Sequence, residues 1–155
     1  MSIPANLLEE GRILLDAPFT TRSMVLEAIA ETLSDSDLPK ASIESKLLER
    51  EELGSTGIGF GVAIPHARLK DLQSTRALFM RTQHGVDFNA PDETSVDLIF
   101  ALLVPEGSNE DYLRLLAQLA RFFSEEQNRQ LLREAGSADK VIDALAETDK
   151  QRQTA

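Results

Sequence analysis

The 155-residue sequence predicts an α/β fold of three layers, in which a mixed β-sheet is sandwiched between helices. Apolar residues recur at helical spacing near both ends of the chain, whereas the middle holds short apolar segments of strand length. One of these, Leu98–Val104, is apolar throughout, as expected of a central strand covered on both faces. We find no internal repeat and no linker. We therefore expect a single domain over residues 1–155, with a core of about 13–147 and frayed ends at 1–12 and 148–155.

The first part of the chain supplies a short strand and a helix. We expect a loosely attached lead-in, in which Asn6–Glu10 could form a turn, and then a strand at Ile13–Leu15. Helical spacing predicts a helix from about Arg22 to Leu33, with Thr20 or Thr21 as its N-cap. Its inward positions are Val25, Leu26, Ile29, Ala30 and Leu33.

A second helix is predicted from about Lys40 to Leu53, after a loop of serine, aspartate and proline. Gly54 suits the C′ position that ends this helix. Arg50 falls in its last turn, next to the glycine-rich segment that follows. The residues expected to face inward are Ile43, Leu47 and Leu48.

The middle of the chain reads as strands joined by turns. A strand at Val62–Ile64 should deliver His66 at its end, and Arg76–Gln83 should form another. His84 and Gly85 have turn character, and Pro105 ends the strand that begins at Leu98.

Three helices follow. Ser108 and Asp111 resemble a capping box for a helix over Glu110–Phe123. The next helix opens at Ser124 and stops at Gly136, and Ser137 caps the last one. The expected inward residues are Leu113, Leu116, Ala117 and Ala120 on the first of these helices, and Val141, Ile142, Leu145 and Ala146 on the last.

Composition limits the classes of function. A net charge of −10 and a pI near 4.6 disfavour nucleic acid and anionic membranes and favour a basic partner surface, although acidity could equally serve only solubility. No apolar run reaches the roughly 18 residues of a membrane span, and the N-terminus lacks signal-peptide character. The absence of cysteine excludes disulfides and thiolate chemistry. We expect a cytoplasmic protein without membrane insertion and without a nucleic-acid partner.

The segment Arg50–Leu69 concentrates the chemistry. It contains Gly54, Gly57, Gly59 and Gly61 and ends near Ile64-Pro65-His66. Glycine permits a close approach of backbone to ligand, and Pro65 stiffens the backbone that aims the imidazole. The segment lacks the Gly-Lys-Ser/Thr of a P-loop, the spacing of a dinucleotide fingerprint, the His-Glu-x-x-His of a metal site and the elbow of a serine hydrolase. We therefore expect no metal and no cofactor.

The run G-S-T-G-I-G-F-G-V-A-I-P-H resembles the active-site signature of the enzyme IIA domains of the phosphoenolpyruvate-dependent phosphotransferase system, fructose/mannitol branch. That branch includes stand-alone nitrogen-regulatory IIA proteins. A second block, Val96–Pro105, also matches, and the resemblance spans about Ile13 to Ala146. It implies the family's three-layer fold and a phosphoryl group accepted by His66 from an HPr-like phosphocarrier protein. By the same analogy the phosphoryl group sits on Nε2, and Nδ1–H bonds a carbonyl.

The resemblance also implies roles for neighbours of His66. Arg50 corresponds to an arginine beside the phosphorylated histidine, although it could instead pair with Glu49 or Glu51. Thr56 could donate its hydroxyl to phosphate or cap local backbone. The backbone N–H groups around Gly57, Gly59 and Gly61 could face phosphate oxygens.

The pattern breaks at one position. Many members carry a second histidine near the start of the helix after L-L-V-P, where this sequence has Tyr112. An alignment shifted by two residues would place Arg114 there instead. His84, the other histidine of the chain, is expected to be a solvated loop residue.

Two functions follow from the resemblance. In the first, a phosphocarrier phosphorylates His66, and the phosphorylation state decides which regulatory target proteins are bound; R-E-x-x-G-S-T-G-I-G resembles the nitrogen-regulatory branch more closely. In the second, His66 passes phosphate from HPr to a IIB domain of a fructose- or mannitol-type transporter. We favour regulation, and the chemistry at His66 is the same in both.

Overall fold

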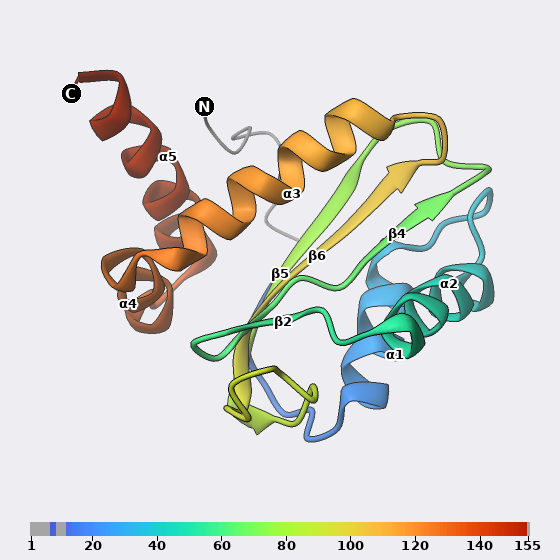
Figure 1. Cartoon of the computed structure of the whole chain (residues 1–155), viewed down its shortest axis with the longest axis horizontal. Helices are drawn as coiled ribbons and strands as arrows, with labels where there is room; N and C mark the ends of the chain where they lie inside the picture. The colour runs from blue at the N-terminus through green and yellow to red at the C-terminus, as the bar shows by residue number, and fades with distance from the viewer. Residues whose placement is uncertain (1–6, 9–11, 155) are drawn as a thin grey trace.

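The computed structural model describes residues 7–8 and 12–154, and side chains through residue 146 at the C-terminal end. A six-stranded sheet forms the centre of the molecule, with helices on both faces (Figure 1). The strands are β1 (Ile13–Ala17), β2 (Gly57–Gly59), β3 (Val62–Ala63), β4 (His66–Leu69), β5 (Arg76–Val86) and β6 (Val96–Pro105).

The sheet is mixed, as predicted. Its order is β1-β5-β6-β3-β2, and β4 also pairs with β6. β1 runs parallel to β5, and both β3 and β4 run parallel to β6, whereas the β5–β6 and β2–β3 pairs are antiparallel. Every residue of Leu98–Val104 is at most 1% exposed, which confirms β6 as the covered central strand.

The helices form the two outer layers. α1 (Arg22–Leu33) and α2 (Lys40–Leu53) cover one face, and α3 (Asn109–Ser124), α4 (Glu126–Glu134) and α5 (Ala138–Thr154) lie on the other (Figure 1). Side chains of β6 alternate between the two faces, because successive residues of a strand point in opposite directions. Ile99, Ala101 and Leu103 join the core under α1 and α2, and Leu98, Phe100 and Leu102 join the core under α3 to α5. Among the described residues, no helix is both long enough and apolar enough to cross a membrane.

The bounds of α1 and α2 agree with the prediction, and the Thr21 hydroxyl caps α1 by accepting the Met24 N–H at 3.2 Å. One inward residue of α2 was wrong. Leu48 is 44% exposed, whereas Glu51, which helical spacing places on the inward side with Leu47, is buried. Gly54 follows α2 with a φ of 156° and is not in the left-handed conformation of a C′ glycine.

The predicted cap of α3 and most of its predicted inward face were also wrong, although Leu116 packs against the core as predicted. The Ser108 side chain makes no capping hydrogen bond. The buried residues of α3 are Leu119, Phe122 and Phe123, and Leu113 is 62% exposed. Ala117 and Ala120 are also exposed, because the helix turns its larger aromatic side chains to the sheet.

Both ends differ in part from expectation. Leu8 is buried and packs in the core under α3 to α5. Of the turn expected at Asn6–Glu10, only Leu7 and Leu8 belong to the described residues. α5 continues to Thr154, although residues from Thr148 were expected to fray. The Ser137 hydroxyl caps α5 as predicted, by accepting the Lys140 N–H at 3.3 Å.

The glycine-rich segment is a hairpin, which the sequence did not predict. β2 and β3 pair across a turn at Phe60 and Gly61, and both of these residues have positive φ. His84 and Gly85 lie within β5 and not in a turn, at an irregularity in the pairing with β6. His84 is exposed, as expected.

Candidate functional site

The backbone around His66 is fixed by the central strand. His66 is the first residue of β4 and pairs with Leu102 of β6, so it does not end the preceding strand as predicted. The carbonyl of Pro65 accepts the Leu102 N–H at 2.9 Å. His66 is 8% exposed, so the residue is buried against the sheet.

Two contacts define the protonation of the His66 ring. Nδ1 lies 2.8 Å from the Ile64 carbonyl oxygen, which can only accept, so Nδ1 carries the proton. Nε2 is then unprotonated, and its lone pair accepts a hydrogen bond from the Arg50 Nε–H at 3.2 Å. Burial lowers the pKa of His66 below its ordinary value, and the charges of Arg50 and Arg68 lower it further, against the effect of the Ile64 carbonyl. The geometry presents a neutral imidazole with a nucleophilic Nε2.

Arg50 reaches this ring from the last turn of α2. Its Nη1 donates to the Gly54 carbonyl at 2.7 Å while its Nε donates to His66. The acidic neighbours on α2 have other partners, because Glu49 pairs with Lys46 and Glu51 with Arg22. The structure therefore brings Arg50 beside His66, as the sequence indicated.

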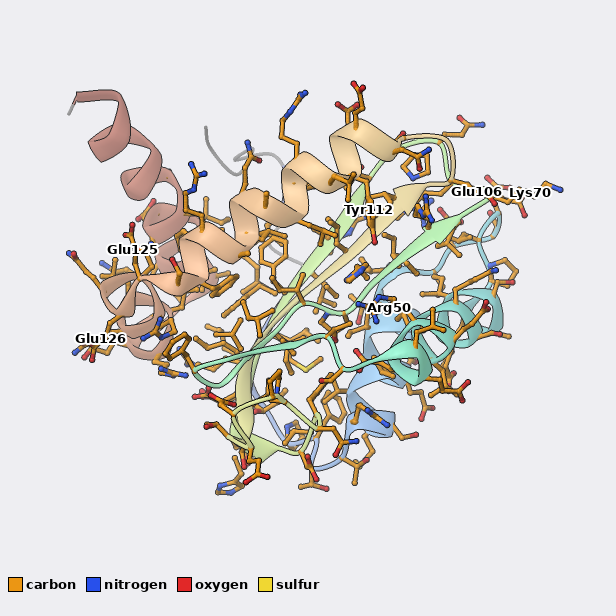
Figure 2. All side chains as sticks on the ribbon, viewed as in Figure 1. Arg50, Lys70, Glu106, Tyr112, Glu125 and Glu126 are labelled. Atoms are coloured by element: carbon orange, nitrogen blue, oxygen red, sulfur yellow. The ribbon has the colours of Figure 1, made fainter. Side chains whose placement is uncertain are left out.

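His66 and Arg50 line a cavity of about 400 Å³ between α2, β4 and the start of α3. Figure 2 places Arg50 beside α2 and Tyr112 on the α3 side, with Glu106 near the end of β6. Three cationic and two acidic side chains share this cavity, so it can accept a small anion. The lining residues are Lys46, Glu49, Arg50, Leu53, His66, Ala67, Arg68, Glu106, Asn109 and Tyr112.

Tyr112, which the family resemblance aligns with a second histidine of many members, lies beside His66 and lines the cavity. Its ring centroid lies 5.6 Å from that of His66, at 55° between the planes. Burial raises the pKa of Tyr112, against the opposing charges of Arg68 and Arg50, so the phenol keeps its proton and can donate a hydrogen bond. Arg114, the alternative from a shifted alignment, pairs with Asp111 in a largely exposed contact and does not line the cavity.

The sequence did not point to Arg68 and Asn109. The Arg68 Nη1 donates to Asn109 Oδ1 at 2.6 Å, and its guanidinium carbon lies 5.5 Å from the centroid of Tyr112. Arg68 is the second residue after His66 on β4, with only Ala67 between them, and this spacing places both side chains on one side of the strand. That alternation was a usable signal once β4 was recognised as a strand.

The expected phosphate-binding loop does not line this cavity. The Thr56 hydroxyl donates to the carboxylate of Glu51, which is neither of the two roles expected of it, and Thr56 does not line the cavity. A Cβ on Gly57 would lie 2.9 Å from the Cβ of Ala90, and Gly61 has a φ of 79° beside Arg133 and Asp97. Gly57, Gly59 and Gly61 thus serve the packing and the turn of the hairpin. We drop the expectation that they cradle phosphate.

Over residues 7–8 and 12–146, no group of three or more His, Cys, Asp or Glu side chains is placed to hold an ion.

Comparison with known proteins assigns the family. Residues 6–148 match the family described as "Phosphoenolpyruvate-dependent sugar phosphotransferase system, EIIA 2". A nitrogen regulatory protein of Pseudomonas aeruginosa is 39% identical over 145 residues, covering 92% of this chain and 94% of that protein. A fructose-specific EIIA component of the phosphotransferase system from Haloferax volcanii is 37% identical, covering 87% of this chain and 89% of that protein.

A solved structure agrees with this assignment. The nitrogen regulatory protein IIA-Ntr from Neisseria meningitidis superimposes with a TM-score of 0.88 at 37% identity, covering 91% of this chain and 97% of that one. The three-layer fold and the sequence match thus point to the same group of proteins. The chain belongs to the EIIA 2 family of the phosphoenolpyruvate-dependent sugar phosphotransferase system.

Proposed function

We propose that His66 accepts a phosphoryl group on Nε2 from an HPr-like phosphocarrier protein, and that its phosphorylation state regulates protein partners. The observation that carries this proposal is the pair of contacts on the His66 ring: Nδ1–H is held by the Ile64 carbonyl, and Nε2 keeps its lone pair beside Arg50. Members of this family are components of a phosphotransferase system, and a nucleophilic imidazole nitrogen can accept the phosphoryl group that such a system transfers. The proposal places the protein in the cytoplasm, in agreement with a sequence that has no cysteine.

The transfer step follows from the tautomer. The Nε2 lone pair attacks phosphorus and forms a P–N bond, while the bond between phosphorus and the donor breaks and leaves its electron pair on the donor. His66 keeps the Nδ1 proton, so its ring gains positive charge as the new bond forms. The Ile64 carbonyl at 2.8 Å stabilises that charge.

Arg50 must exchange one partner during this step. Its Nε–H occupies the Nε2 lone pair in the free protein, and an incoming phosphoryl oxygen can replace Nε2 as acceptor. The hydrogen bond from Nη1 to Gly54 can persist and keep the guanidinium in place. Phosphoryl transfer depends mainly on such positioning and charge stabilisation.

Arg68 and Tyr112 complete the site from the other side. Tyrosine supplies a neutral donor where many family members have a histidine, so it adds no positive charge near neutral pH. Arg68, which lies over the Tyr112 ring and lines the same cavity, supplies that charge. In this chain we assign charge compensation to two arginines and a hydrogen bond to the phenol.

The face around the cavity suits a protein donor. Leu53, which lines the cavity, is an apolar side chain that is 83% exposed. The whole chain carries a net charge of −10. A phosphocarrier with an apolar centre and a partly basic rim would fit this face, and its association should weaken with salt.

Regulation is favoured over transport by the relatives that are named nitrogen regulatory proteins and by the resemblance of R-E-x-x-G-S-T-G-I-G to that branch. Phosphorylation adds about −1.5 to −2 charges and three acceptor oxygens, which can change the partners that this face binds. The similarity to a fructose-specific EIIA component keeps a second function in view, in which His66 passes phosphate to a IIB domain.

The test is the mass of the intact protein after incubation with phosphoenolpyruvate, enzyme I and a phosphocarrier, kept alkaline because phosphohistidine is acid-labile. We expect one added phosphoryl group in the wild type and in His84→Ala, and none in His66→Ala. Phosphate retained by His66→Ala would refute the assignment. Onward transfer to an added fructose-type IIB domain would favour transport, and partner binding that changes with phosphorylation, without such transfer, would favour regulation.

A further inference from the structure

A buried carboxylate lies directly beside the proposed site and takes no part in the chemistry described so far. Glu51 follows Arg50 in α2, and its side chain is fully inaccessible to solvent. Among the described residues it is the only acidic one that is buried. A buried carboxylate is costly unless hydrogen bonds and opposite charge compensate it, so its contacts indicate what it holds in place.

Glu51 joins three segments of the chain. The Thr56 hydroxyl donates to Oε1, and the Thr56 backbone N–H donates to Oε2 at 3.3 Å. The Arg22 guanidinium, at the start of α1, lies 3.7 Å from Oε2. The carboxylate therefore fastens the connection between α2 and β2 to both helices of this face.

From Thr56, one hydrogen-bonded path leads to the imidazole. The Thr56 carbonyl accepts the Ile64 N–H at 3.0 Å, and the Ile64 carbonyl accepts the His66 Nδ1–H at 2.8 Å. The position of the Ile64 peptide groups thus depends on Thr56, and the His66 tautomer depends on the Ile64 carbonyl.

A second path leads to the guanidinium. The Glu51 carbonyl accepts the Gly54 N–H at 3.1 Å, and the Gly54 carbonyl accepts the Arg50 Nη1–H at 2.7 Å. Residues 54–56 form the segment that Glu51 holds. The His66 imidazole and the Arg50 guanidinium are therefore both linked by hydrogen bonds to this short connection.

We propose that Glu51 is a positioning residue, which through Thr56 and the connection 54–56 fixes the Nδ1–H tautomer of His66 and the direction of Arg50. Glu51 does not touch the reacting atoms. Its carboxylate has two acceptor oxygens for the two donors of Thr56, and an amide at the same place has only one acceptor oxygen. Glu51→Gln therefore keeps the shape of the side chain but removes the charge facing Arg22. It keeps both contacts with Thr56 only if the Thr56 hydroxyl reverses from donor to acceptor.

The first test measures the tautomer in the unphosphorylated protein. Nitrogen-15 spectra of the His66 ring, recorded above its pKa, should show Nδ1 protonated and Nε2 unprotonated in the wild type. In Glu51→Gln the two signals should move toward each other as the second tautomer becomes populated. The matched control is Glu52→Gln, because Glu52 is the next residue, is exposed and carries the same charge. It should give the wild-type spectrum.

The second test measures phosphoryl transfer from the phosphorylated carrier in single-turnover experiments. Small displacements of reacting groups are costly, so we expect Glu51→Gln to slow the step by about tenfold to a hundredfold, with Glu52→Gln unchanged. A folded Glu51→Gln variant with the wild-type tautomer and rate would overturn the proposal.

Thr56 provides an independent pair of variants should Glu51→Gln not fold. Thr56→Val keeps the branched shape and removes the hydroxyl, whereas Thr56→Ser keeps the hydroxyl. A tautomer change in Thr56→Val that is absent in Thr56→Ser supports the proposal, and a wild-type spectrum in both overturns it. The expected change in transfer rate rests on the proposed function, whereas the expected change in tautomer is measured in the unphosphorylated protein and does not. A wild-type protein that takes up no phosphate would refute the function alone.

Discussion

Arg50→Ala tests the electrostatic half of the proposed site. The substitution removes a guanidinium that donates at 2.7 Å to Gly54 and at 3.2 Å to Nε2 of His66. Arg50 is only partly buried and its contact with Gly54 is exposed, so the fold should survive with a loss of about 1 kcal/mol or less. The effect should therefore fall on the transfer step.

The size of that effect follows from the contacts. During transfer the Nε–H exchanges His66 for a phosphoryl oxygen, and a hydrogen bond involving a charged group contributes roughly 1.5–3 kcal/mol. Since about 1.4 kcal/mol corresponds to a tenfold change in rate, transfer should slow by about 10-fold to 150-fold. The pKa of His66 should also rise, but it should remain below its ordinary value because burial, the largest cause of its lowering, persists.

The assay is single-turnover transfer from a phosphorylated carrier, together with an NMR titration of the His66 ring. Arg114→Ala is the control, because Arg114 lies two residues from Tyr112, is exposed and does not line the cavity. An Arg50→Ala variant with the rate and the His66 pKa of the wild type would refute a role for this arginine.

Three further predictions follow. Because burial, and then Arg50 and Arg68, lower the pKa of His66 below 6.5, its contribution to stability should be fully present above about pH 6.5 and be lost as the pH falls through the folded-state pKa. In urea unfolding at neutral and mildly acidic pH, the free energy of unfolding should fall less with acid in His66→Gln than in the wild type. An equal fall in both proteins would contradict this. Tyr112→Phe should slow transfer only about 2-fold to 10-fold, since it removes one neutral donor worth about 0.5–1.5 kcal/mol; a drop as large as that of Arg50→Ala would show that the phenol matters more. Gly61→Ala places a Cβ 2.6 Å from Arg133 Nη2 at a φ of 79°, so it should destabilise the fold by about 1–3 kcal/mol and leave transfer by the folded protein near wild type. Slow transfer in a stable Gly61→Ala variant would indicate that the glycine-rich hairpin contacts the phosphoryl group after all.

Much of the architecture could be predicted because it rests on local patterns. Helical spacing gave α1 and α2 with the bounds that the structure has, and the apolar run of β6 identified the central strand. α3 was harder, because two neighbouring stripes of its surface are apolar. The sheet buries the stripe with Phe122 and Phe123, and Leu113 is left at the surface.

The sequence pointed to His66 and to Arg50 beside it, but not to most of their surroundings. His66 and Arg50 stand in a recognisable order, and their contact forms across 16 residues of chain. The glycines looked like a ligand loop because a glycine-rich run has the same appearance in a tight hairpin. Local spacing could place Arg68 on the His66 side of β4 and Glu51 on the inward side of α2, but it could not identify their partners. Arg68 contacts Asn109 and Tyr112, and Glu51 contacts Arg22 and Thr56, all of which lie outside those two elements.

The central claim is that a phosphoryl group resides on Nε2 of His66 while Nδ1 keeps its proton. The most direct measurement is a set of phosphorus-31 and nitrogen-15 spectra of the protein with labelled histidine rings, recorded after phosphorylation by the carrier at alkaline pH. We predict phosphorus coupling to Nε2 of His66, a retained proton on Nδ1 and an unchanged His84. Coupling to Nδ1 of His66, or to either nitrogen of His84, would contradict the account.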